Sequence, residues 1–109
     1  MTVQLPGPIA AYFSASNAAN ADAVAAVFAP ESEVRDEGGT HRGRAAIAAW
    51  AGDTIGRYRM QAEPLTLDDA GERHTVTARV SGTFPGSPLV FTYRFDVASD
   101  AVQALEISL

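Results

Sequence analysis

The segment that decides the fold is VRDEGGTHRGRAAIAAW, residues 34–50. At its start, Glu33 to Asp36 reads charged, apolar, charged, charged, which predicts a short strand. The strand would end at Gly38-Gly39, a pair typical of a tight turn, and Thr40 to Arg42 would return as its partner. The segment therefore predicts a hairpin that leads directly into a helix.

The helix predicted after this hairpin runs from Arg44 to Ile55. Gly43 breaks the returning strand, and we expect Gly56 to end the helix, because glycine is common directly after a helix. The helical spacing predicts a buried face made of Ile47, Trp50, Ala51 and Thr54.

Two shorter helices are predicted upstream. The first begins at Pro8, since proline suits the first helical turn, and runs to about Ala18. Asn20 is a plausible N-cap for the second, which Pro30 would close. Their predicted buried faces hold Ile9, Tyr12, Phe13 and Ser16 in the first, and Val24, Val27 and Phe28 in the second.

Everything after Gly56 is predicted to be extended, in four runs joined by turn sequences. Polar and apolar side chains alternate in these runs, so one face of the sheet should be apolar and the other wet. His74 is expected to be exposed at the start of a strand. Helices followed by an antiparallel sheet indicate an α+β domain, with a pocket where the helices cover the sheet. The predicted runs are Arg57 to Leu67, His74 to Phe84, Leu89 to Val97, and Val102 to Leu109.

The composition leaves few chemical options. The 109 residues include no Cys and no Lys, and the formal net charge is −5. Disulfides, thiolate nucleophiles and Schiff-base chemistry are therefore excluded. The negative balance argues against nucleic acid and against an anionic membrane as partners. We predict one cytoplasmic domain over residues 1–109, with no cofactor and no metal.

Asp36 is the first candidate for chemistry. It shares strand parity with Val34, so if Val34 faces the core, the carboxylate does as well. Burial without a cationic partner raises the pKa of a carboxyl group and suits it to act as a general acid or base. The alternative is a turn aspartate that accepts hydrogen bonds from the backbone of Gly38 and Gly39. The pattern leaves both interpretations open.

Tyr12 and His41 are further candidates. Tyr12 lies on the apolar face of the first predicted helix, where its hydroxyl could donate to a developing oxyanion or simply be satisfied within the core. His41 lies across the hairpin from Asp36 and can titrate near neutral pH, although a lone His in such a strand is more often just exposed. Four aromatic residues could line a ligand pocket or form ordinary core packing: Trp50, Tyr58, Phe91 and Tyr93.

The whole chain resembles the SnoaL-like branch of the nuclear-transport-factor-2-like superfamily. The resemblance rests on the aromatic pair Tyr12-Phe13, the phrase VFAPES at residues 27–32, the V-x-D motif at 34–36, and the glycine followed by Ala-Ile-x-x-Trp in HRGRAAIAAW at 41–50. It implies a cystatin-like fold, a cone-shaped α+β barrel in which about three N-terminal helices pack on a curved, mostly antiparallel sheet. The superfamily includes isomerases, cyclases and non-catalytic modules, so the fold alone does not fix the activity.

Over Tyr12 to Asp36 the chain is also similar to ketosteroid isomerases. That similarity implies Tyr12 as the oxyanion-donating tyrosine and Asp36 as the proton-shuttling aspartate, and it puts a second donor near Phe91, which cannot donate. We expect an apolar pocket for a small hydrophobic carbonyl compound, with cofactor-free isomerase or cyclase chemistry. The alternative is a non-catalytic binding or dimerisation module. The family also implies a homodimer through the wet face of the sheet, which here would carry Thr75, Thr77, Arg79, Thr92 and Arg94.

Overall fold

The computed structural model describes residues 4–36 and 38–108. None of the helices in these two stretches is long and apolar enough to span a membrane. The elements, in chain order, are α1 (Gly7–Asn17), α2 (Ala21–Ala26), β1 (Phe28–Asp36), β2 (Gly39–Arg42), α3 (Arg44–Tyr58), β3 (Gln61–Ala70), β4 (Arg73–Ser81), β5 (Leu89–Ala98) and β6 (Ala101–Ser108).

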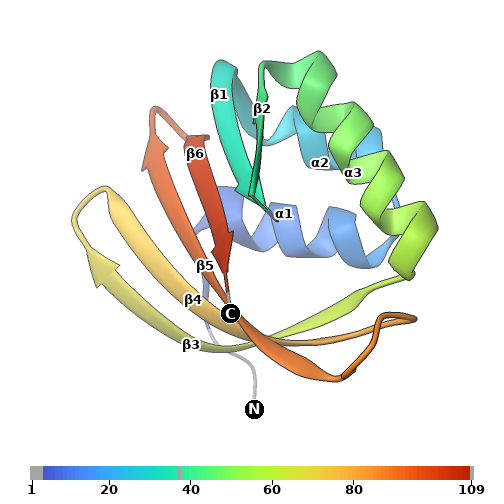
Figure 1. Cartoon of the computed structure of the whole chain (residues 1–109). Coiled ribbons are helices and arrows are strands. Elements are labelled where there is room, and N and C mark those ends of the chain that lie inside the picture. Colours follow the sequence, from blue (N-terminus) through green and yellow to red (C-terminus); the bar gives the residue numbers. More distant parts are fainter. Residues whose placement is uncertain (1–3, 37, 109) are drawn as a thin grey trace.

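The strands form one curved six-stranded sheet in the order β2-β1-β6-β5-β4-β3 (Figure 1). The β1–β6 pair is parallel, and the other neighbouring strands are antiparallel. The sheet does not close on itself, because β2 and β3 remain as its two edges. The predicted α+β class and mostly antiparallel sheet are confirmed, in an open form of the cone.

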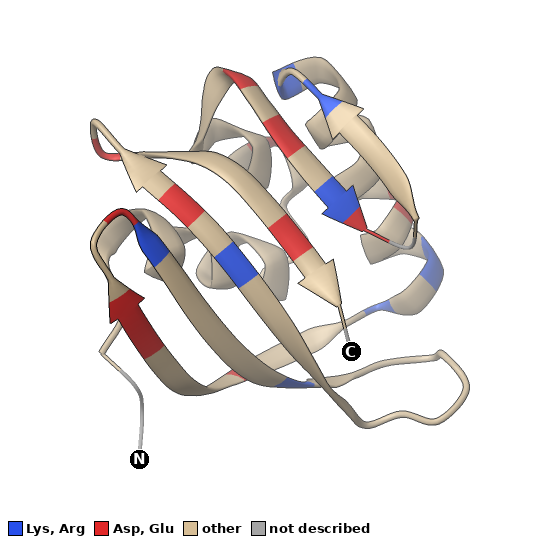
Figure 2. Cartoon of the chain, turned by 60° about the vertical axis from the view of Figure 1, so that its left-hand side comes forward, with Lys and Arg blue, Asp and Glu red and all other residues tan. Residues whose placement is uncertain are grey.

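The outer face of the sheet carries charges of both signs, as the strand alternation predicts (Figure 2). Ion pairs connect adjacent strands along it, and each contributes little because at least one partner of each pair is well exposed to water. The cross-strand pairs are Arg42–Glu33 at 2.9 Å, Arg73–Asp96 at 2.8 Å, Arg79–Glu63 at 3.1 Å and Arg94–Glu106 at 3.6 Å.

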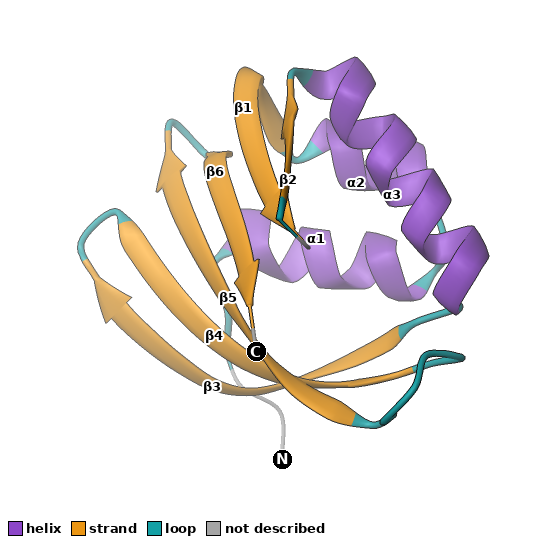
Figure 3. Ribbon diagram, viewed as in Figure 1, coloured by secondary structure: helices purple, strands orange, loops and turns teal. Residues whose placement is uncertain are grey.

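The helices lie on the concave face (Figure 3). There they pack against alternate side chains of the strands, which are fully buried at Val76, Phe95 and Leu105. An aromatic cluster joins α1 to β5, in which the ring of Phe13 lies 5.0 Å from that of Tyr93, centroid to centroid, with the edge of one ring toward the face of the other. Such edge-to-face pairs stabilise a core beyond their buried area.

The region between α2 and β1 differs from the prediction. Asn20 caps α2 as expected, accepting a hydrogen bond from the backbone N–H of Ala23 at 3.1 Å. The helix ends at Ala26, however, before Pro30, and β1 already begins at Phe28. The cause is long-range pairing, because the carbonyl of Val27 accepts the N–H of Val102 at the start of β6 at 2.9 Å.

Helix α3 runs through Gly56 and ends at Tyr58, one turn beyond the predicted end, so that β3 begins only at Gln61. An interior glycine costs a helix only about 1 kcal/mol, which tertiary contacts outweigh here. Thr83 satisfies the last carbonyls: its N–H donates to the carbonyl of Tyr58 at 2.8 Å, and its hydroxyl lies 3.1 Å from the carbonyl of Arg57. Arg59 then leaves the helix in a left-handed conformation.

His74 is buried, contrary to the predicted exposure. It has the same strand parity as Val76, so its side chain faces inward, and only 8% of the residue is exposed. Its Nδ1 atom lies 3.1 Å from Oδ1 of Asp69, in an orientation that is not aligned for a hydrogen bond. Strand parity, and not the position at the start of the strand, decides the burial of His74.

Candidate functional site

A cavity of about 230 Å³ lies between α1, α3 and the concave face of the sheet. Aromatic and aliphatic side chains make up most of its wall, with a few polar groups among them, as in many small-molecule sites. The lining residues are Tyr12, Ser16, Val24, Asp36, Trp50, Ala51, Thr54, Ile55, Tyr58, Met60, Ala62, Phe84, Pro85, Phe91, Tyr93 and Ile107.

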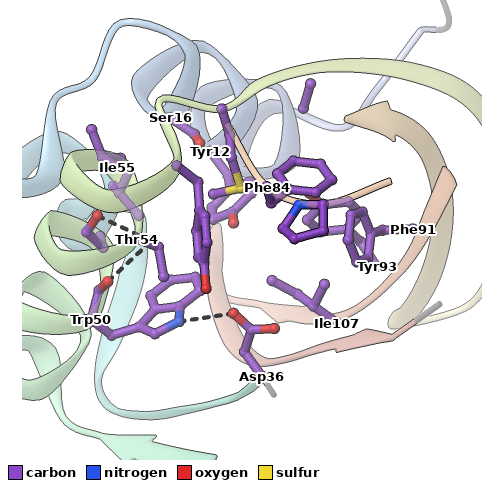
Figure 4. Close-up of a pocket in the computed structure, with 16 residues that line it drawn as sticks. Tyr12, Ser16, Asp36, Trp50, Thr54, Ile55, Phe84, Phe91, Tyr93 and Ile107 are labelled. Carbon is purple, nitrogen blue, oxygen red and sulfur yellow. Dashed lines mark hydrogen bonds between the residues drawn. The ribbon is translucent and has the colours of Figure 1, made fainter. Parts of the chain in front are cut away.

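Asp36, at the end of β1, lines this cavity with its half-buried side chain. Val34 is fully buried, so the shared parity carries the carboxylate to the concave side as predicted. Oδ2 of Asp36 accepts a hydrogen bond of 3.0 Å from the indole Nε1–H of Trp50 on α3. In Figure 4 the carboxylate lies between Trp50 on one side and Ile107 and Tyr93 on the other.

The Trp50 contact fixes the position of the carboxylate. It links the end of β1 to the middle of α3, two elements that the intervening hairpin already holds close. An indole N–H can only donate a hydrogen bond, so it orients the carboxylate but cannot accept a proton from it. Sequence reasoning placed Trp50 on the buried face of this helix but missed its partner, although a buried tryptophan regularly needs an acceptor for its N–H.

Tyr12 and Tyr93 bring two phenol groups to the same cavity, from α1 and β5. Burial raises the pKa of Tyr12 well above its ordinary value, and the nearby Tyr93 and Asp36 raise it further. Burial and the charge of Asp36 raise the pKa of Tyr93 as well. Both groups therefore stay protonated over the physiological pH range and can serve as neutral hydrogen-bond donors.

The other predicted pocket residues divide into two groups. Trp50, Tyr58 and Phe91 line the cavity. Among the described residues His41 is not part of the lining, and its ring lies against that of Trp50 with centroids 6.0 Å apart. His41 is thus a neighbour of the group that holds Asp36.

Several lining residues gave no signal in the sequence. Phe84 was predicted at the end of a strand, but β4 ends at Ser81, so Phe84 and Pro85 both lie in the loop between β4 and β5, and no local pattern indicates that this loop lines a cavity. Ser16 and Thr54 were placed on buried helix faces without a role. The hydroxyl of Thr54 lies 3.1 Å from the carbonyl of Trp50 and 3.2 Å from that of Ala51, so it is satisfied within α3.

In the parts of the chain that the structure describes, no three His, Cys, Asp or Glu residues lie close enough to hold a metal ion. The chemistry that the cavity can support with its own groups is proton transfer. It has one carboxylate to take a proton, and it has neutral phenols to stabilise negative charge on an oxygen.

Three helices on a curved, open sheet, with a pocket between the layers, define the class of nuclear-transport-factor-2-like proteins. The family model of the SnoaL-like domain matches residues 9–103. The chain belongs to the SnoaL-like domain family. No curated protein matches it.

Solved structures agree with this assignment. A candidate polyketide cyclase from Sinorhizobium meliloti is 38% identical, with a TM-score of 0.92 over 95% of both chains. A protein with a ketosteroid isomerase-like fold from Catenulispora acidiphila, in complex with trimethylamine, is 19% identical, with a TM-score of 0.87 over 97% of this chain and 87% of that one. An epoxide hydrolase/cyclase-like enzyme with a role in pyran-ring formation in the polyether salinomycin is 18% identical, with a TM-score of 0.81 over 93% and 86%. The last two, at such identities, support the fold alone.

Proposed function

We propose that the protein catalyses cofactor-free proton transfer on a small, hydrophobic carbonyl compound, in a reaction of the isomerase or cyclase type. The observation that carries the proposal is the carboxylate of Asp36 in the wall of an apolar cavity, held by the Trp50 N–H and close to the buried phenol of Tyr12. The similarity to the candidate polyketide cyclase supports the reaction class.

In the proposed reaction Asp36 removes a proton from the carbon next to the carbonyl group. The electrons of the C–H bond move into the carbonyl, and the resulting enolate oxygen accepts a hydrogen bond from Tyr12. Asp36 can return the proton at another carbon, which completes an isomerisation. In a cyclisation the enolate carbon instead attacks a second carbonyl carbon of the same substrate, and the new alkoxide takes the proton from Asp36.

Exchange of substrate protons for deuterium tests the base directly. A panel of small aryl and cyclic ketones is incubated with the protein in heavy water, and loss of the α-proton signal is followed by NMR. We expect exchange that Asp36→Asn slows by about 10²- to 10⁴-fold, the usual contribution of a general base. The control is Asp53→Asn, the same change at an exposed carboxylate of α3. Equal rates in the wild type and in Asp36→Asn would exclude Asp36 as the base.

The second candidate function is binding without catalysis. Phe91 favours it, because the phenylalanine stands where the resemblance implies a second donor. This function would be supported if ketones bind in the cavity but their α-protons exchange no faster than in buffer, both with the wild type and with Asp36→Asn.

We also propose that two copies associate through the outer face of the sheet. Its threonines and its charged side chains offer both hydrogen-bond donors and acceptors. Ion pairs such as Arg94–Glu106 can also form between the two copies instead of within one. Light scattering at micromolar concentration should give about twice the chain mass of 11.4 kDa. A single species of 11.4 kDa would refute the dimer.

A further inference from the structure

Two buried tyrosines line the cavity, and their hydroxyl groups have no hydrogen-bond partner within the described chain. Tyr12 is 4% exposed and Tyr93 is 5% exposed, and their rings lie 6.2 Å apart, centroid to centroid, at an angle of 61°. In residues 4–36 and 38–108 neither hydroxyl makes a hydrogen bond, to the other or to any other group. Both hydroxyls are therefore donors available to whatever occupies the cavity, whether solvent or a ligand.

The surroundings of the two hydroxyls define which group can use them. Both belong to residues that line the same cavity as Asp36, whose charge acts on both phenols. No Arg, Lys or His is found among the described lining residues, so the wall has a carboxylate but no cation. A ligand carboxylate or phosphate would be repelled, whereas an uncharged acceptor oxygen would be bound.

We propose that Tyr12 and Tyr93 together bind one carbonyl oxygen of an uncharged, hydrophobic ketone or aldehyde, with Tyr93 as a second donor beside Tyr12. The inference rests on the proposed function and deepens it, since it limits the substrate to uncharged ketones and aldehydes and adds a second catalytic residue. As negative charge develops on the oxygen, both hydrogen bonds strengthen, and loss of one such donor typically slows a reaction about 10²- to 10³-fold. The position of the oxygen also decides which carbon of the substrate faces Asp36.

The fold brings the two tyrosines to the same cavity from different elements. Tyr93 and Phe91 have the same parity in β5, so both side chains face the cavity, and Tyr12 reaches it from α1. The edge-to-face contacts of Phe13 with both tyrosine rings hold them in place, with centroid distances of 5.2 Å to Tyr12 and 5.0 Å to Tyr93. Donors that are rigid before the ligand arrives need little reorganisation during the reaction.

Binding of acetophenone, an aryl ketone, tests the proposal without any turnover. Ethylbenzene is its hydrocarbon match, so the ratio of the two dissociation constants isolates the contribution of the carbonyl oxygen from that of packing. The ¹³C chemical shift of the bound carbonyl carbon is a second readout, because each hydrogen bond to the oxygen moves it downfield. The variants are Tyr12→Phe and Tyr93→Phe, with Ser14→Ala, an exposed hydroxyl of α1, as the control.

We expect each Phe variant to reduce the preference for acetophenone by about threefold to tenfold, and to move the carbonyl shift part of the way back. Ethylbenzene binding should change little, which shows that the cavity is intact. If Tyr93→Phe leaves both the preference and the shift as in the wild type, Tyr93 is not a donor and the proposal is wrong. These readouts need no proton abstraction, so they stay valid in Asp36→Asn even if the proposed reaction itself fails.

Discussion

Alkaline pH should destabilise the fold through its two buried tyrosines, and the composition makes the effect easy to isolate. The chain has no Lys and no Cys, so tyrosines are the only side chains expected to titrate between about pH 9 and about pH 12. In a Tyr58→Phe background, the tyrosines that remain are Tyr12 and Tyr93. The pKa of each is raised in the folded state, chiefly by burial.

The sign and size of the effect follow from proton linkage. In the unfolded chain a tyrosine ionises near its ordinary pKa of 10.0, whereas in the folded protein these two remain protonated. The unfolded state then binds fewer protons, and the free energy of unfolding falls as the pH rises. Each tyrosine costs about 1.4 kcal/mol between about pH 9 and about pH 11, or about 2.7 kcal/mol for both. Below about pH 9 the full stability is present.

Urea unfolding followed by circular dichroism measures the loss directly. A fall of this size lowers the urea midpoint by roughly 1 to 2 M for a domain of ordinary denaturant sensitivity. Adding Tyr12→Phe to the Tyr58→Phe background should halve the pH effect. The reasoning fails if the midpoint does not move. It also fails if tyrosinate absorbance appears in the folded protein at about pH 11, since burial would then not hold the pKa values up.

Three substitutions test the packing around the site, each measured by urea unfolding. Ser32→Ala should lower the free energy of unfolding by about 1 to 3 kcal/mol, because the buried hydroxyl lies 2.6 Å from the carbonyl of Ala29 and 2.8 Å from that of Val102; an unchanged value would mean that water replaces it. Gly56→Ala should raise the free energy by about 0.5 to 1 kcal/mol, since a Cβ atom there meets open space within α3. Gly82→Ala should lower the free energy of unfolding by about 1 to 3 kcal/mol, because the Cβ would lie 2.5 Å from the carbonyl oxygen of Tyr58. Equal stability of Gly56→Ala and Gly82→Ala would contradict both expectations.

The local sequence pattern was sufficient to predict most of the helices and strands and the placement of Asp36, Tyr12 and Trp50. Strand parity placed Asp36 on the same side as Val34, and helix spacing placed Tyr12 and Trp50 on buried faces, because both rules depend on the backbone alone. The same rule accounts for His74, which faces inward with Val76.

What could not be predicted depends on contacts between distant segments. Pro30 suggested the end of a helix, but the hydrogen bond between Val27 and Val102 helps to start a strand at Phe28, two residues before the proline. Gly56 suggested another helix end, but Thr83 satisfies the carbonyls one turn later and brings Tyr58 to the cavity. In both places a weak local preference lost to a long-range hydrogen bond.

The cavity itself is a structural argument for a ligand. In an ordinary core, close-packed aliphatic side chains would fill this space. The wall instead holds a carboxylate, which is expensive to bury, and two phenols without partners in the described chain. The N–H of Trp50 offsets part of the cost of burying Asp36, whereas the two phenol hydroxyls are left to whatever occupies the cavity. An acceptor oxygen bound between Tyr12 and Tyr93 would accept both hydrogen bonds, so a bound ketone should stabilise the wild type more than it stabilises the Tyr12→Phe variant.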